Sequence, residues 1–163
     1  SNDTIPTAIC MSALFDMDEF LFPGLDFLIE EVEKKAKNLH GQIKTGRTHM
    51  MDAMPLDFHQ ELMGWSAQLK SCKTSLTIAT KRMMQLPQGG TAIGTGVNSH
   101  KGFAKAFCQT MEKVSGFKVK PASNFFQGLS SQDNSAELSS AVKNLALVLM
   151  KISNDLRLMN SGP

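Results

Sequence analysis

The sequence predicts an all-α fold, an elongated bundle of long and mostly antiparallel helices. Two observations support this prediction. Apolar or small residues step alternately by four and three positions through residues 58–86, and a similar stripe runs through residues 138–159. Such spacing places the side chains on one face of a helix, as in a coiled-coil seam. Both helices would be much longer than an average globular helix, so each needs long partners to cover its stripe.

Five helices are expected in chain order. The first runs from Pro6 to about Leu21, because proline is tolerated in a first turn, and the second begins after Pro23 and stops at Gly41. A shorter amphipathic helix fills residues 100–115. The stripes of the two long helices consist of Phe58, Leu62, Trp65, Leu69, Cys72, Leu76, Ala79, Met83 and Leu86 in the first, and Leu138, Val142, Leu145, Leu149, Ile152, Leu156 and Met159 in the second.

Three segments between the helices are predicted to be loops: "TGRTHMMDAMP" from residue 45, "PQGGTAIGTG" from residue 87 and "GFKVKPASN" from residue 116. Within them only "FKVK" has the alternation of a strand. The glycine-rich segment lacks the order G-x-G-x-x-G and a Walker lysine, and it follows a helix rather than a strand. We therefore interpret it as a sharp loop that needs positive φ angles and close backbone approach, rather than as a nucleotide site.

Composition limits the classes of function. The 163 residues suit one domain, residues 1–163, and 17 basic against 15 acidic residues leave a net charge too weak to indicate nucleic acid as a partner. No apolar run approaches the ~20 residues that cross a membrane. The chain is expected to be intracellular, and because it opens on "SND" without an initiator methionine, it is expected to be a segment of a longer chain.

Cysteine and histidine spacing argues against a metal site. Cys10, Cys72 and Cys108 do not have the spacing of a zinc site or a redox pair, so packed, reduced thiols are expected. The four histidines lack the i, i+4 pairing of a helical metal site, and no metal or cofactor is predicted. His49 lies in a predicted loop beside Thr48. By itself such a histidine is more often structural or merely exposed than catalytic.

Four motifs resemble those of class II fumarases in the fumarase/aspartase superfamily. "GRTHMMDAMPL" resembles the signature G-R-T-H-x-x-D-A-x-P-L, and "SNDTIPTA" resembles the latter part of S-S-N-D-x-x-P-T-A. "GGTAIGTGVN" and "LMKISNDLRLMNSGP" match two further family stretches. The four motifs occur in family order and with family-like spacing, so the resemblance covers the whole chain.

The resemblance implies the central helical domain of a homotetrameric enzyme whose active sites are each assembled from three chains. It implies that Ser1, Asn2 and Thr48 contact the carboxylates of a small dicarboxylate and that His49 is the catalytic acid/base residue. The implied reaction is the reversible hydration of fumarate to L-malate, a step of the tricarboxylic acid cycle. The implied compartment is the cytoplasm, or the mitochondrial matrix in a eukaryote.

The chemistry suits these residue types. Hydration of fumarate needs an acid and a base, and it needs donors that stabilise a dianionic aci-carboxylate. A histidine titrates near neutrality and can pass protons in either direction. Two alternatives stay open: an aspartase, which adds ammonia instead of water, and a non-catalytic helical scaffold like the lens crystallins.

Two departures from the family pattern affect these expectations. The family's G-S-S-x-M-P-x-K-x-N loop, which carries a serine base, does not occur in this sequence, so the segment alone is expected to be inactive. In addition, Asp57 and His59 stand where smaller or neutral residues are usual, which affects the geometry expected around the histidine motif.

Overall fold

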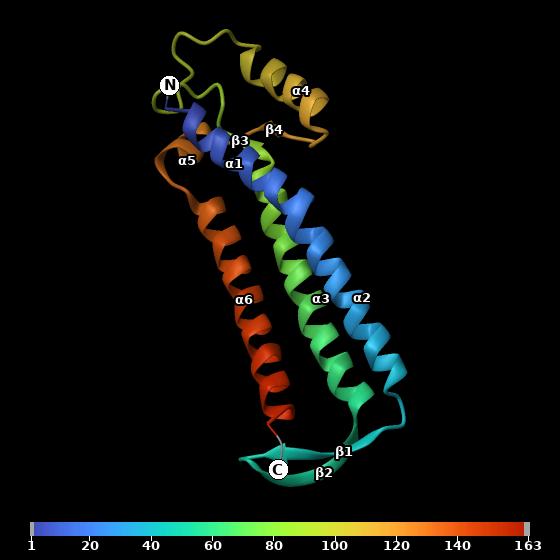
Figure 1. Cartoon of the computed structure of the whole chain (residues 1–163). Helices are drawn as coiled ribbons and strands as arrows, with labels where there is room; N and C mark the ends of the chain where they lie inside the picture. The colour runs from blue at the N-terminus through green and yellow to red at the C-terminus, as the bar shows by residue number, and fades with distance from the viewer. Residues whose placement is uncertain (1, 162–163) are drawn as a thin grey trace. The chain divides into compact units, whose positions relative to one another are not determined.

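The computed structural model describes residues 2–161 and confirms the all-α class (Figure 1). The elements in chain order are α1 (Thr4–Asp16), the π-helical turn η1 (Met17–Leu21), α2 (Phe22–Asn38), β1 (Ile43–Thr48), β2 (Met51–Asp57), α3 (Phe58–Met83), β3 (Gln85–Leu86), α4 (Phe103–Ser115), β4 (Lys120–Pro121), α5 (Phe125–Ser130) and α6 (Asp133–Met159).

The chain divides into two compact units, which we describe separately. Unit 1 contains the chain up to Leu21 together with Ser75–Val142, and unit 2 contains Phe22–Thr74 together with the chain from Lys143 onward. The two long helices, α3 and α6, each contribute a part to both units. None of the helices within residues 2–161 is long and apolar enough to cross a membrane.

Unit 2 is a layer of antiparallel helices. Figure 1 shows α3 running between α2 and α6, in the direction opposite to both. Polar contacts connect the helices around an apolar centre: the Ser66 hydroxyl donates to Glu33 Oε1 at 2.6 Å, and the Trp65 indole N–H donates to Asp155 Oδ2 at 3.2 Å. Lys70 and Ser66 hold the pKa of the Glu33 carboxyl below its ordinary value. These contacts set the register of α2 and α6 against α3.

The stripe of α3 is confirmed as a core. Its members from Leu62 to Met83 are all buried, and Leu69 and Leu76 are completely inaccessible to solvent. Leu86, predicted as the last member of the stripe, is also buried but lies in β3, after the end of α3. The stripe of α6 is confirmed only in part, because Leu138, Leu145 and Ile152 are buried. Of its other members, Leu149 is half-buried and Val142, Leu156 and Met159 are exposed. Exposed apolar positions on α6 include Val142, Leu147, Met150, Leu156, Leu158 and Met159. The single chain therefore leaves a large part of α6 uncovered.

Unit 1 contains the remaining helices and the longest loop. The Phe15 and Phe117 rings meet edge to face at 5.1 Å between their centroids, and β3 pairs with β4 in parallel. Cys10 and Cys108 are buried here, as Cys72 is in unit 2, which confirms the predicted packed thiols. Burial raises the pKa of all three cysteine thiols. A raised pKa keeps a thiol protonated and poorly reactive.

Three predictions about local structure were wrong. Residues 45–55, predicted as a loop, form most of the antiparallel β1–β2 hairpin. Both faces of this hairpin are largely exposed, so it lacks the alternation of apolar and polar residues that reveals a half-buried strand. The predicted strand "FKVK" contributes only Lys120 to β4. The short helix α5 was missed because its only strong signal is Asn124, whose side chain accepts the Gln127 N–H as an N-cap.

Candidate active site

His49 and Met50 form the two-residue turn between β1 and β2. Their φ angles are 52° and 58°, and positive φ at both positions is what the type I′ turn of a tight hairpin requires. Asparagine and glycine are the usual residues there, and residues other than glycine rarely adopt positive φ. Strained backbone of this kind is concentrated at functional sites. Thr48, which pairs with Met51, precedes the turn directly, so Thr48 and His49 are exposed together at the hairpin tip.

Gly46 allows the two strands to meet near that tip. The β1–β2 register shifts between Thr45 and Arg47, so Gly46 of β1 lies opposite two residues of β2, Ala53 and Met54, as at a β-bulge. A Cβ atom at this position would lie 2.6 Å from the Met54 carbonyl oxygen, closer than real Cβ atoms approach. The glycine of the G-R-T-H motif is therefore required for the close approach of β1 to β2.

The base of the hairpin is fastened to the start of α3. The Lys44 ammonium pairs with Glu61 Oε2 at 2.5 Å and lies 5.1 Å from the centroid of the Phe58 ring. These contacts join β1 to the first turn of α3. Thr48 and His49 therefore lie at the tip of a hairpin whose other end is held against α3.

Asp57 caps the helix that follows the hairpin. Its carboxylate accepts the backbone N–H groups of Gly41 and His59, both at 2.7 Å, while its own N–H donates to Gln60 Oε1 at 3.0 Å. Asp57 thus accepts the N–H of the second helical residue, while the side chain of the third, Gln60, accepts the Asp57 N–H, a variant of the capping box. The aspartate that departs from the family pattern thus has a local structural role. His59 lies beside it, with its ring 5.2 Å from that of His40 in an edge-to-face contact.

We expect Asp57→Ala to lower the thermal unfolding midpoint of the full-length protein at neutral pH. The N–H groups of Gly41 and His59 hold the pKa of the Asp57 carboxyl below its ordinary value of 3.8. The ionised form is therefore favoured in the folded state, and its stabilising effect is present above pH 3.8 and is lost as the pH falls through the lower folded-state pKa. The difference in midpoint between wild type and variant should shrink in that acidic range.

The matched control for this experiment is Asp57→Asn, whose side chain can still accept as a cap but does not titrate. The difference in unfolding midpoint between Asp57→Asn and Asp57→Ala should persist in acid. A wild-type advantage over Asp57→Ala that stayed constant from neutral pH to strong acid would contradict the assigned role of the charge.

In unit 1, the residues at the start of α1 contact the glycine loop, which we define as residues 87–96. The Asn2 side-chain amide donates to the Ala92 carbonyl at 2.8 Å. Asp3 is only 2% exposed, and its Oδ2 accepts the N–H groups of Gly89 at 2.9 Å and Thr91 at 3.1 Å. Ser1, the other predicted carboxylate contact, lies outside the described residues.

The glycine loop has the sharp, close-packed form that was predicted. Gly89, Gly94 and Gly96 have φ angles of 104°, 114° and 70°. A Cβ atom on Gly89 would lie 2.7 Å from the Ala104 Cβ, and one on Gly94 would lie 2.8 Å from the Phe126 backbone nitrogen. The loop therefore packs directly against the starts of α4 and α5. Thr91, a residue with a side chain, also has a positive φ of 60°.

The structure thus places the predicted site residues in two groups. Thr48 and His49 lie together in unit 2, and Asn2 lies in unit 1 beside the glycine loop. Sequence reasoning missed Asp3. An acidic residue directly before a helix is ordinarily expected to cap it, yet the side chain of Asp3 makes no cap hydrogen bond and turns to the loop instead. The only signal was its place beside Asn2 in "SND".

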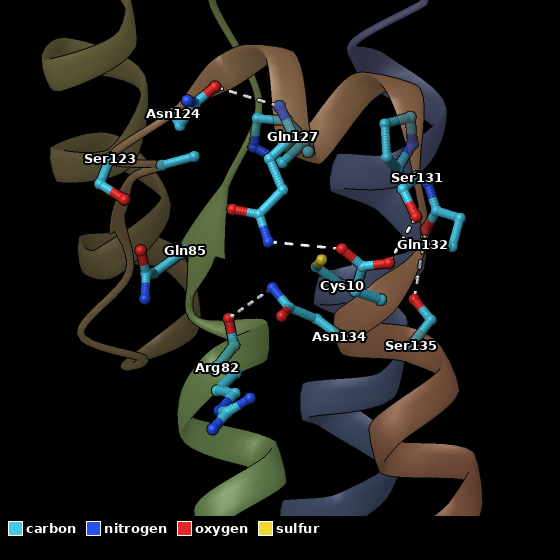
Figure 2. A pocket seen from close by; sticks show the side chains of 15 residues that line it. Cys10, Arg82, Gln85, Ser123, Asn124, Gln127, Ser131, Gln132, Asn134 and Ser135 are labelled. Atoms are coloured by element: carbon cyan, nitrogen blue, oxygen red, sulfur yellow. Dashed lines mark hydrogen bonds between the residues drawn. The ribbon is translucent and has the colours of Figure 1, made fainter.

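A separate cavity of about 260 Å³ opens in unit 1 (Figure 2). Figure 2 shows side chains from α1, the end of α3 and the α5–α6 connection around it. Several of its polar groups bond one another: Asp133 accepts from Ser131 at 2.5 Å and from Gln127 at 3.4 Å, which lowers the pKa of the Asp133 carboxyl. None of the predicted site residues within 2–161 lines this cavity. It is therefore distinct from the predicted site.

In unit 2 the hairpin tip offers an imidazole beside a hydroxyl, groups that suit proton transfer and carboxylate binding. In unit 1 the Asn2 side chain offers an amide, which also suits carboxylate binding. In the described chain, residues 2–161, no three His, Cys, Asp or Glu side chains are grouped so that they could hold a metal ion. A family model described as "Lyase" matches residues 1–163. The chain belongs to this lyase family.

Within this lyase family, the chain is similar to proteins named as class II fumarases. The chain is 47% identical to "Fumarate hydratase class II" of Xylella fastidiosa strain Temecula1 and 44% identical to "Fumarate hydratase class II 2" of Pseudomonas aeruginosa, each over 163 residues. The crystal structure of recombinant class II fumarase from Schistosoma mansoni matches 99% of the chain with a TM-score of 0.96 and 34% identity. The chain spans 34%, 36% and 37% of the lengths of these three proteins. The resemblance drawn from the four motifs is confirmed.

Proposed function

We propose that the full-length protein is a fumarate hydratase, which reversibly adds water to fumarate to give L-malate, and that this chain supplies its central helical domain. The observation that carries the proposal is the hairpin tip, where Thr48 and His49 are exposed on a strained turn with a fixed base. The relatives named fumarate hydratase, matched over the whole chain, support the same reaction.

Each predicted residue has a defined task in this reaction. The Thr48 hydroxyl and the Asn2 amide donate hydrogen bonds to the substrate carboxylates, as does Ser1. His49 acts as the acid/base residue that exchanges a proton during addition or loss of water. As a proton leaves carbon, negative charge moves onto the neighbouring carboxylate, and fixed O–H and N–H donors lower the energy of that dianion.

We propose further that the active site is shared between subunits of a homotetramer. The support is on α6, which leaves apolar side chains such as Leu147, Met150 and Leu156 exposed. Extended apolar surface of this kind favours association into oligomers. As a fumarate hydratase, the protein would serve the tricarboxylic acid cycle in the cytoplasm or, in a eukaryote, in the mitochondrial matrix.

An aspartase and a non-catalytic scaffold are the competing functions. The names of the matched relatives favour addition of water over addition of ammonia. A scaffold that had lost its chemistry would have no need of a histidine in the left-handed conformation at an exposed turn, because glycine or asparagine fits that turn with less strain.

An assay of the full-length protein tests the proposal. We expect purified protein to deplete fumarate, followed by its ultraviolet absorbance, with malate as the product and with no added cofactor. L-Aspartate serves as the competing substrate. Release of fumarate and ammonia from aspartate without hydration of fumarate would identify an aspartase instead, and no turnover of either compound would identify the scaffold.

A further inference from the structure

Asp3 makes an unusual set of contacts for an acidic residue at the start of a helix. The carboxylate is buried, and a single oxygen, Oδ2, accepts backbone N–H groups from two residues of the glycine loop, Gly89 and Thr91. These donors lie 86 and 88 residues away along the chain. Because a buried N–H group that loses its acceptor is costly, these two hydrogen bonds are a firm connection between the residues before α1 and the loop.

The same two segments are joined a second time through Asn2. Ala92 directly follows Thr91, and its carbonyl accepts the Asn2 side-chain amide at 2.8 Å. The carboxylate of Asp3 therefore fixes the backbone on one side of Ala92, and the Ala92 carbonyl in turn fixes the orientation of the Asn2 amide. Adjacent residues at the start of α1 are thus coupled through the loop, in addition to the peptide bond between them.

The loop can transmit this coupling because its other contacts leave it little freedom. Gly89 packs on Ala104 and Gly94 packs on Phe126 so closely that a Cβ atom would not fit at either glycine. Thr91 adopts a positive φ, a conformation that needs support from its surroundings in a residue with a side chain. The Thr91 N–H that Asp3 accepts supplies such support.

We propose that Asp3 is a positioning residue of the active site: its carboxylate holds residues 89–92 of the glycine loop so that the Ala92 carbonyl aims the Asn2 amide at the substrate carboxylate. The inference rests on the proposed function, which gives Asn2 its role.

A double-mutant cycle in the full-length protein tests this coupling. We expect Asp3→Ala to lower kcat/KM for fumarate by roughly 100-fold, the scale of loss when a binding group is misplaced by about 1 Å. Asp3→Asn keeps an oxygen acceptor for the two N–H groups and should recover most of that loss. Because Asp3 acts through Asn2, Asp3→Ala introduced into Asn2→Ala should cost less than about threefold, a strong departure from additivity.

Hydrogen exchange supplies a readout that does not depend on activity. The amides of Gly89 and Thr91 should exchange faster in Asp3→Ala than in wild type. The matched control is Thr7→Val. Thr7 is buried nearby, and its hydroxyl donates to the Asp3 backbone carbonyl at 2.8 Å, so this variant removes a hydrogen bond from Asp3 without touching the carboxylate. It should leave kcat/KM and the loop amides nearly unchanged.

The outcomes separate the inference from the proposed function. Equal costs of Asp3→Ala in the wild-type and Asn2→Ala backgrounds, or unchanged exchange at Gly89 and Thr91, would overturn the positioning role while leaving fumarate hydration intact. Faster exchange in Asp3→Ala combined with full activity of Asn2→Ala would instead show that the connection to the loop exists and that the assignment of Asn2 is wrong. The positioning role would then fall with that assignment.

Discussion

Replacement of His49 by asparagine in the full-length enzyme is expected to lower kcat by about 10²–10⁴-fold, the usual contribution of general acid/base catalysis. The hairpin turn allows this variant to change the side chain without changing the backbone. His49 has a φ of 52°, and asparagine is among the residues that adopt the left-handed conformation most readily. The variant should therefore keep the turn while losing the group that exchanges protons. Steady-state kinetics over a range of pH measures the loss.

Thr48→Val is the matched control from the same hairpin tip. Loss of a hydroxyl that donates to a substrate carboxylate should raise KM as well as lower kcat, and both limbs of the pH profile should be kept. For His49→Asn we expect a limb of the profile to disappear. A His49→Asn enzyme with near-normal kcat and an unchanged pH profile would show that His49 is an ordinary exposed turn residue.

Truncation of Leu69 is expected to have the largest effect on stability, a loss of about 3–5 kcal/mol in the free energy of unfolding for Leu69→Ala. Leu69 is 0% exposed and lies in the middle of the α3 stripe in unit 2. Alanine would remove buried apolar surface and leave a cavity, because close-packed helices relax only partly around the missing atoms. Urea unfolding of the full-length protein, compared at one protein concentration, measures the change.

Leu69→Met tests whether the effect comes from lost volume. Methionine has a similar volume and adapts its shape, so the cost should stay below about 1.5 kcal/mol. A loss below about 1 kcal/mol for Leu69→Ala would mean that the site collapses around the smaller side chain, and it would contradict the assignment of Leu69 to a rigid core.

The helices could be predicted because a helix with one buried face has a regular spacing of apolar residues within a short stretch of sequence. The alternating steps of the α3 stripe place successive apolar residues on one face, and the structure buries those residues as expected. The glycine loop could also be interpreted, because clustered glycines indicate positive φ and close approach wherever they occur. For Thr48 and His49, the residues alone left the role open, and only the motif resemblance indicated a site.

The hairpin and the role of Asp3 could not be predicted in the same way. The β1–β2 hairpin has no buried face, so no alternation marks it, and its turn consists of His49 and Met50 rather than the usual asparagine and glycine. The hydrogen bonds of Asp3 reach residues more than 80 positions away. No pattern within a short window of sequence contains such a contact.

The sequence by itself therefore determined the all-α class, the core stripe of α3, the sharp glycine loop and, through its motifs, the membership of the lyase family. Only the tertiary structure decided that His49 occupies the turn of a hairpin, that the Asp57 carboxylate also binds the distant Gly41 N–H, and that Asp3 holds the loop beside Asn2. The physical reason is the separation along the chain between the residues that interact. Periodicity and glycine conformation act between near neighbours in the chain, whereas side-chain orientation and long-range hydrogen bonds exist only after distant segments have packed together.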